Sequence, residues 1–265
     1  MISPFILIKG AGEMASAVAH RLYGANLRRI CLIDIASPLA VRRSVSFCPA
    51  LELGRATVEG LEAVAVANGQ ALENVWSTGC LGVALLDDWR ANAFPAPDVV
   101  IDAILAKRNL GTDRSQAGLV IALGPGFEAG IDAHLVIETN RGHDLGRIIR
   151  QGPAAPNTGI PGNIGGFTSQ RVLRAPGDGL FVGRREIGDA VKQGEVIGQV
   201  GGMDVAAPLD GVVRGLIRSQ TQVTKGLKIG DIDPRGDAAF CFTISDKARA
   251  IAGSVLEAVL SHVNH

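Results

Sequence analysis

The chain lacks an excess of charge of either sign. Its 26 lysines and arginines are balanced by 26 aspartates and glutamates, which gives a formal net charge of zero at pH 7. Proteins that bind nucleic acid or anionic membranes through their overall electrostatic field carry a basic excess. We therefore expect neither nucleic acid nor membrane as a partner, and we expect any bound anion to be held by a local group of residues.

The sequence is also poor in cysteine pairs and long apolar runs. Its four cysteines, Cys31, Cys48, Cys80 and Cys241, form no CxxC pair, which argues against a disulfide framework or a zinc site and favours reduced thiols. No run approaches 18 apolar residues, and the opening "MISPFILIKG" reaches glycine too early for a signal peptide. We therefore expect a cytoplasmic protein.

Motifs of several enzyme classes are missing as well. We find no P-loop, no HExxH, no nucleophile elbow and no Ser-His-Asp arrangement at a supporting spacing. The motifs therefore name no reaction, and whether the chain is an enzyme stays open.

What is present is an apolar, globular composition with strand and helix patterns in alternation. The 265 residues are enough for one large domain or two modest ones, of which two is the better starting expectation, and 47% of them are apolar. The start reads as strand "FILIKG", turn "GAG", helix "EMASAVAHRLYGAN" and strand "ICLID". Buried strands are also predicted over 83–86, 99–105, 119–123 and 135–138, with two short edge strands within 55–66. The fold class expected is α/β, with a Rossmann-like open parallel sheet.

The amino-acid composition of the chain changes after residue 150. Residues 1–150 are predicted to form the nucleotide-binding domain, and 151–170 a junction rich in glycine and proline. Residues 171–240 contain short strands and two copies of an AP-x-x-G element, at 175–179 and 207–211, which predicts a small β-barrel or sandwich with internal repeats. Residues 241–265 are expected to form a helix, capped by Ser245, that packs on the sheet.

The glycine turn is the first candidate binding element. The sequence "GAGEMA" satisfies GxGxxA between a strand and a helix, where Gly10 allows a tight turn, Gly12 admits a diphosphate and Asp34 reaches a ribose hydroxyl. The alternative is a structural turn in which Glu13 itself meets the helix dipole. Alternatively, Asp34 caps the segment that follows it, "SPLAVRR". In that segment Arg42 and Arg43 either bind a phosphate or face solvent.

Further candidates follow the other predicted strands, because ligands of open α/β sheets lie beyond the carboxyl ends of the strands. Lys107 and Arg108 offer a point charge and a planar fork to a phosphate. The predicted cofactor-binding residues are Gly10, Gly12, Asp34, Arg42, Arg43, Asp102, Lys107, Arg108, Asn109, Gly124 and Gly126.

The stretch from Leu123 to Ile149 holds histidines among carboxylates and suggests a metal site. In a strand, however, His134 and Glu138 lie roughly 13 Å apart, too far for one ion. We therefore predict no metal there. The polar loop remains as a ligand-binding lid, an active site or a salt-bridge clasp, with candidate residues Glu138, Arg141, His143, Asp144 and Arg147.

Several segments, taken in their order and spacing, resemble a known family. They include "GAGEMASAVAHRL", "DAILAKRNLGT", "LGPGFEAGIDAHLVIETNRGHDLGRII" and "APNTGIPGNIGGFTSQRVLRAPGDG". The chain resembles the YqeB-like family of selenium-dependent molybdenum hydroxylase system proteins from about Phe5 to Leu260, and its first half is similar to the XdhC/CoxI insertion factors for the molybdenum cofactor.

The resemblance implies an accessory or maturation factor for a molybdenum hydroxylase that binds molybdopterin or its dinucleotide form. Its partners would be the hydroxylase apoenzyme or other maturation proteins. An NAD(P)-dependent oxidoreductase, a nucleotidyl-transfer enzyme and a non-catalytic scaffold with a structural glycine turn stay open as alternatives, and a homo-oligomer is compatible with the sequence.

The second half resembles a biotinyl/lipoyl-like barrel-sandwich hybrid, a fold whose carrier members present a modifiable lysine at a hairpin tip. The corresponding tip here, "VGGMDV" at 200–205, has no lysine. We therefore expect no covalent biotin or lipoate.

Overall fold

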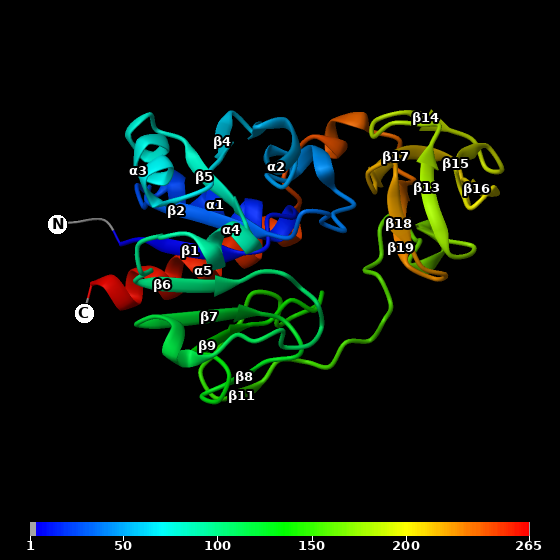
Figure 1. Ribbon diagram of the computed structural model, residues 1–265. Coiled ribbons are helices and arrows are strands. Elements are labelled where there is room, and N and C mark those ends of the chain that lie inside the picture. The colour runs from blue at the N-terminus through cyan, green and yellow to red at the C-terminus, as the bar shows by residue number, and fades with distance from the viewer. Residues whose placement is uncertain (1–3, 265) are drawn as a thin grey trace. The chain divides into compact units, whose positions relative to one another are not determined.

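The computed structural model describes residues 4–264, which divide into two compact units (Figure 1). Unit 1 comprises residues 4–38, Ser46–Thr158 and 244–264, and unit 2 comprises Leu39–Val45 and Gly159–Thr243. Residues 39–45, which the sequence analysis placed in the first domain, thus cluster with the second unit. The C-terminal helix belongs to unit 1.

A nine-stranded sheet forms the centre of unit 1, in the order β10-β9-β7-β6-β1-β2-β5-β4-β3. Six neighbouring strands are parallel, namely β5 (Leu81–Leu85), β2 (Ile30–Asp34), β1 (Ile6–Lys9), β6 (Val99–Asp102), β7 (Leu119–Leu123) and β9 (Leu135–Ile137). Three further strands complete the sheet: β4 (Leu61–Ala65) parallel to β5, and the antiparallel edges β3 (Arg55–Val58) and β10 (Ile148–Ile149). The predicted α/β class with a parallel sheet is confirmed, as are the two edge strands within 55–66.

Helices cover both faces of this sheet, because alternate residues of a strand project to opposite sides. Phe5 and Leu7 share a buried cluster with Trp76 of α3 (Gly69–Ser77) and Trp89 of α4 (Leu86–Ala91). Helix α1 (Glu13–Gly24) lies beside α5 (Asp246–Val263), which also contacts β7 and β9 (Figure 1). A short α2 (Ala50–Leu53) precedes β3.

The connection from β6 to β7 contains no α-helix. It consists of an irregular loop and a 3-10 helix, η2 (Arg114–Gln116). The predicted strand over 99–105 ends at Asp102, because the Asp102 carboxylate accepts a hydrogen bond from the N–H of Ile104 and Leu105 has a positive φ of 59°. Loop residues, rather than a helix, therefore follow the carboxyl end of β6. A small two-stranded sheet of β8 (Glu128–Ala129) and β11 (Gly152–Pro153) lies further along unit 1.

Unit 2 consists of two four-stranded antiparallel sheets that share one hydrophobic core. The first has the order β12 (Val172–Arg174), β19 (Lys228–Asp233), β17 (Gly211–Leu216) and β14 (Ala190–Val191). The second has the order β16 (Met203–Ala206), β15 (Val196–Val200), β13 (Gly179–Gly183) and β18 (Thr221–Val223). Three 3-10 helices belong to this unit: η1 (Arg43–Val45), η3 (Ser169–Arg171) and η4 (Ala238–Cys241). The described strands close no barrel, and the barrel-sandwich hybrid stays a prediction.

The two AP-x-x-G elements occupy equivalent positions in unit 2. Ala175 donates its backbone N–H to Leu227 and accepts one from Gly226, and Ala207 makes the matching pair with residues 194–195. Both alanines are buried, and each element ends at the first residue of a strand. The internal repeat predicted from the sequence is thus present in the hydrogen bonding.

Candidate functional site

The glycine turn joins β1 to α1, and its two glycines have different roles. Gly10 has a φ of 92°, and a Cβ at this position would lie 3.2 Å from the carbonyl oxygen of Ala103, so the turn itself requires glycine. Gly12 caps α1 in an extended conformation, and a Cβ there would meet nothing within 4 Å. Gly10 therefore serves the fold, while open space lies over Gly12 at the end of the helix.

Asp34 connects this turn to the end of β2. One carboxylate oxygen accepts the N–H of Ala11 at 2.7 Å, and the other accepts the N–H of Ile35 at 2.8 Å. Burial raises the pKa of Asp34 above its ordinary value, although both hydrogen bonds oppose the shift. A carboxylate has about four acceptor positions, so Asp34 retains capacity for a ligand hydroxyl.

A chain of hydrogen bonds that the sequence analysis missed begins at Lys9. The Lys9 ammonium donates to Thr112 Oγ1 and Gln116 Oε1, both at 2.7 Å, and the Thr112 hydroxyl donates to Asp102 Oδ2 at 2.6 Å. Lys9 and Asp102 are register partners on neighbouring strands. Burial lowers the pKa of Lys9, as does the charge of Arg90, and the Asp102 carboxylate opposes both. Asp102, predicted as a ligand contact, is buried and supports Lys9.

These groups lie around a cavity of about 490 Å³ within unit 1. Its polar wall is formed by Lys9, Asp34, Arg90 and Gln116. Its apolar wall includes Leu7, Ile33, Leu86, Trp89 and Ile104. Gly10 borders it as well. The cavity therefore combines an apolar wall with two cations and one carboxylate, at the carboxyl ends of β1 and β2.

The loop after β6 is braced by its own contacts and by the turn at Gly126. The Asn109 side chain accepts the N–H groups of Gly111 and Thr112, so it stabilises the loop itself. Lys107 and Arg108 are exposed and do not line the cavity. Gly126, with a φ of 101°, lies against the backbone of Arg108, where a Cβ would come within 2.6 Å.

Gly124 and Lys247 complete the surroundings of this loop. A Cβ at Gly124 would overlap the side chain of Thr139, which explains the glycine by packing. The sequence analysis missed Lys247, at the start of α5. Burial lowers its pKa first, and the nearby charges of Lys107 and Arg141 lower it further. The carboxylates of Glu13 and Glu138 oppose this shift.

The polar loop from Glu138 to Arg147 forms a clasp within unit 1. Buried Glu138 accepts the N–H groups of Asn140 and Ala155, both at 2.7 Å. Arg141 donates two hydrogen bonds of 2.8 Å to Asp246 at the start of α5. The second ion pair of the loop joins Arg147 to Asp144 at 3.5 Å, and His143 is exposed. Of the three interpretations of this loop, its internal contacts favour the clasp.

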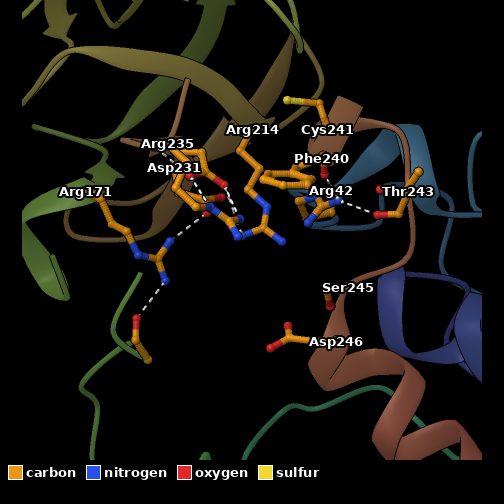
Figure 2. A network of polar contacts seen from close by, with 12 residues as sticks. Arg42, Arg171, Arg214, Asp231, Arg235, Phe240, Cys241, Thr243, Ser245 and Asp246 are labelled. Atoms are coloured by element: carbon orange, nitrogen blue, oxygen red, sulfur yellow. Dashed lines mark hydrogen bonds and ion pairs between the residues drawn. The ribbon is translucent and has the colours of Figure 1, made fainter. Parts of the chain in front are cut away.

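Arg42 and Arg43 belong to unit 2 and do not line the cavity. The Arg42 guanidinium donates to the carbonyl oxygens of Phe240 and Thr243 (Figure 2). Arg43 donates to the carbonyl oxygen of Leu216. We therefore correct their assignment: their guanidinium groups bind backbone carbonyls of unit 2. The sequence analysis had considered them as phosphate ligands because they follow the second predicted strand.

The same unit contains a buried network of arginines and aspartates (Figure 2). Arg171 donates to Asp231 at 2.8 Å, and both side chains are buried. Asp233 has no exposed surface; it accepts two hydrogen bonds from the Arg235 side chain and forms an ion pair with Arg214 at 3.5 Å. Burial would raise the pKa of Asp233, but the Arg235 hydrogen bonds and the arginine charges outweigh it and hold the pKa below its ordinary value.

Two classes of site receive no support from residues 4–264. No group of three or more histidine, cysteine, aspartate or glutamate side chains is arranged there to hold a metal ion. No helix in this range is long and apolar enough to span a bilayer. All four cysteines are free thiols.

Comparisons with solved structures give only weak likenesses. They include an aspartoacylase family protein from Mesorhizobium loti (16% identity, 87% of this chain and 85% of that one, TM-score 0.28) and an ectoine utilization protein from Ruegeria pomeroyi (11%, 86% and 52%, TM-score 0.23). A third is a succinylglutamate desuccinylase/aspartoacylase from Rhodobacter sphaeroides (22%, 24% and 22%, TM-score 0.22). TM-scores this low do not establish a shared fold.

The sequence comparisons are more informative. No protein-family model matches the chain. The chain is 47% identical over 262 residues to the uncharacterized protein YqeB of Escherichia coli K12, covering 96% of this chain and 47% of YqeB. It thus spans about half the length of this curated relative. This identity supports the assignment of the chain to a YqeB-like family.

Proposed function

We propose that unit 1 binds a nucleotide-type cofactor, molybdopterin or its dinucleotide form, and that the protein serves as a maturation factor for a molybdenum hydroxylase. The observation that carries the binding proposal is the cavity bordered by Gly10 and Asp34 at the carboxyl ends of β1 and β2. Its volume of about 490 Å³ falls within the range of small-molecule sites.

The strand order supports this proposal. The parallel strands β5-β2-β1-β6-β7-β9 run in the order of a doubly wound, Rossmann-like dinucleotide-binding sheet. In such sheets the chain order reverses between the first and fourth strands, here β1 and β6, and ligands bind at that crevice. Asp34 stands at the position where this fold class holds a ribose, and Gly10 of the glycine turn borders the same cavity.

The molybdenum part of the proposal rests on the resemblance of the sequence to molybdenum hydroxylase system proteins. It implies transfer of the cofactor to a hydroxylase apoenzyme, directly or through other maturation proteins. Unit 2, with its two sheets and repeated AP-x-x-G elements, is a barrel-sandwich-like module in this proposal and a docking element for such a partner. The Val200–Val205 tip has no lysine to carry a covalent cofactor.

Native mass spectrometry of freshly purified protein tests the identity of the ligand. A bound pterin nucleotide is the result expected. A bound nicotinamide dinucleotide would instead favour the NAD(P)-dependent oxidoreductase, and turnover of a nucleoside triphosphate with the pterin would favour nucleotidyl transfer. A protein that neither carries a nucleotide nor binds an added one would be a scaffold with a structural glycine turn.

Asp34→Asn tests the site itself. We expect this change to weaken binding of a nucleoside, measured by titration calorimetry, by about tenfold or more, because a hydrogen bond to a charged acceptor contributes about 1.5–3 kcal/mol. Asparagine relieves a buried charge whose pKa is raised by burial, but it keeps only one of the two acceptor oxygens, so circular dichroism checks the fold of the variant before the titration. Glu257→Gln, on the exposed surface of α5, is the matched control and should bind normally. Equal affinity in a folded Asp34→Asn protein would contradict this site.

A further inference from the structure

Lys9 is held in place as a cation at the wall of the cavity. An ammonium group has three donor protons, and two of those on Lys9 are committed to Thr112 and Gln116. Thr112 donates its own hydroxyl proton to the buried carboxylate of Asp102, which fixes the direction of the chain. Because Lys9 also lines the cavity, its third proton is available to a ligand.

Arg90 provides a second cation to the same cavity. Its side chain is exposed on α4, and it makes no hydrogen bond or ion pair with any residue in 4–264. It lies close enough to Lys9 for the two charges to interact. Two like charges at the wall of one cavity repel each other, and an anionic ligand group would relieve this repulsion.

The start of α1, by contrast, already faces a carboxylate. Glu13 lies in the first turn of this helix and accepts a hydrogen bond of 2.8 Å from the Ser245 hydroxyl. A fixed negative charge at a helix N-terminus uses the same favourable field that a phosphate would use. The cations of the cavity are therefore better placed to hold a phosphate than the helix end is.

We infer that the cavity binds a phosphorylated nucleoside, with its phosphate between Lys9 and Arg90, its ribose at Asp34 and its base against Trp89. The inference rests on the proposed function and adds the class of ligand and the residues that select it. A phosphate pairs with both the ammonium point charge and the planar guanidinium fork. The apolar wall formed by residues such as Leu86 and Trp89 gives the flat base a surface for stacking.

Calorimetric titration of three matched pairs tests the inference: adenosine and AMP, guanosine and GMP, cytidine and CMP. For the pair whose base is accepted, we expect the monophosphate to bind at least tenfold more tightly than the nucleoside. Lys9→Met should abolish this preference while leaving nucleoside affinity within about threefold, since methionine fills most of the same space. Lys225→Met, an exposed lysine of unit 2, is the control and should keep the preference.

Arg90→Gln is a second test of the phosphate site. The Arg90 side chain is exposed on α4, so the substitution should not affect folding. It should reduce the phosphate preference severalfold, whereas Arg184→Gln, an exposed arginine of unit 2, should not. If the nucleotides bind but Lys9→Met and Arg90→Gln both keep the full preference, the inference is overturned and the proposed function stands. If none of the six probes binds, the inference is overturned as well, and the native mass spectrum decides the proposed function separately.

Discussion

Replacing Asp233 with asparagine should destabilise unit 2 by about 3 kcal/mol. Breaking a buried ion pair by removing one partner costs about 3–5 kcal/mol, and the lower value applies because Arg235 is 42% exposed. Asparagine has one acceptor oxygen for two arginines, and its amide group places donors against donors. Hydrogen exchange of the β17 and β19 amides is the measurement of choice, because both tryptophans of the chain lie in unit 1.

The Asp233 carboxylate should also make the stability of unit 2 depend on pH in the acid range. The pKa of Asp233 is lower in the folded protein than in the unfolded chain, so the unfolded state binds more protons between the two values. Its contribution to stability is therefore complete above the unfolded pKa and is lost as the pH falls through the folded pKa. The Asp233→Asn protein should lose less stability than the wild type over this acid range.

Asp210→Asn is the matched control for this prediction. Asp210 pairs with Lys192 on the exposed surface of the same unit, where solvent screens the interaction, so its loss should change stability little. If the β17 and β19 amides exchanged at equal rates in the Asp233→Asn and Asp210→Asn proteins, the buried arginine–aspartate network would not stabilise unit 2.

Gly126→Ala should destabilise unit 1 by about 3 kcal/mol. A residue with a side chain costs about 1–3 kcal/mol at a strained backbone conformation, and an overpacked contact costs about as much again. Gly126 combines both, because its φ is 101° and a Cβ at this position would lie only 2.6 Å from the Arg108 backbone. Urea unfolding followed by tryptophan fluorescence reports on this unit.

Gly130→Ala separates the two contributions. Gly130 has a similar φ of 91°, but a Cβ there would meet nothing within 4 Å, so only the backbone cost of about 1–2 kcal/mol remains. The difference between the two variants measures how tightly the turn at Gly126 fixes the loop that carries Lys107 and Arg108. Equal destabilisation would show that this loop moves aside freely.

The parallel sheet was predictable because buried parallel strands are short, continuous apolar runs. The expected strand over 119–123 has the same bounds as β7. The strand over 99–105 was predicted too long, because apolar Ile104 and Leu105 continue the pattern after the Asp102 side chain has ended the strand. Local side-chain hydrogen bonds of this kind leave no periodic signal.

The cavity was only partly predictable. Gly10 and Asp34 were found because their spacing belongs to a known motif, and both border the cavity. Lys9 was missed although a signal existed: it follows Phe5 and Leu7 at alternate positions, so a lysine had to project from an otherwise apolar face. Thr112 and Gln116, more than 100 residues from Lys9 along the chain, had no such signal.

Arg42 and Arg43 show the opposite case, in which the sequence suggested a ligand contact that the fold does not form. Their position after the second strand fitted a phosphate site, but they bind carbonyls that follow them by more than 170 residues. No composition change marks residues 39–45 as part of another unit. Contacts over such distances depend on the tertiary fold, which strand and helix patterns do not encode.

The split of unit 1 along the chain bears on how the protein folds as it is synthesised. Unit 2 is complete once residue 243 has been made, whereas helix α5, which covers α1, is made afterwards. Domains generally fold as units while the chain emerges, so unit 2 should reach its native state on the ribosome first. Until α5 docks, the side of α1 that it contacts stays uncovered, so the newly made chain exposes apolar side chains there for an interval.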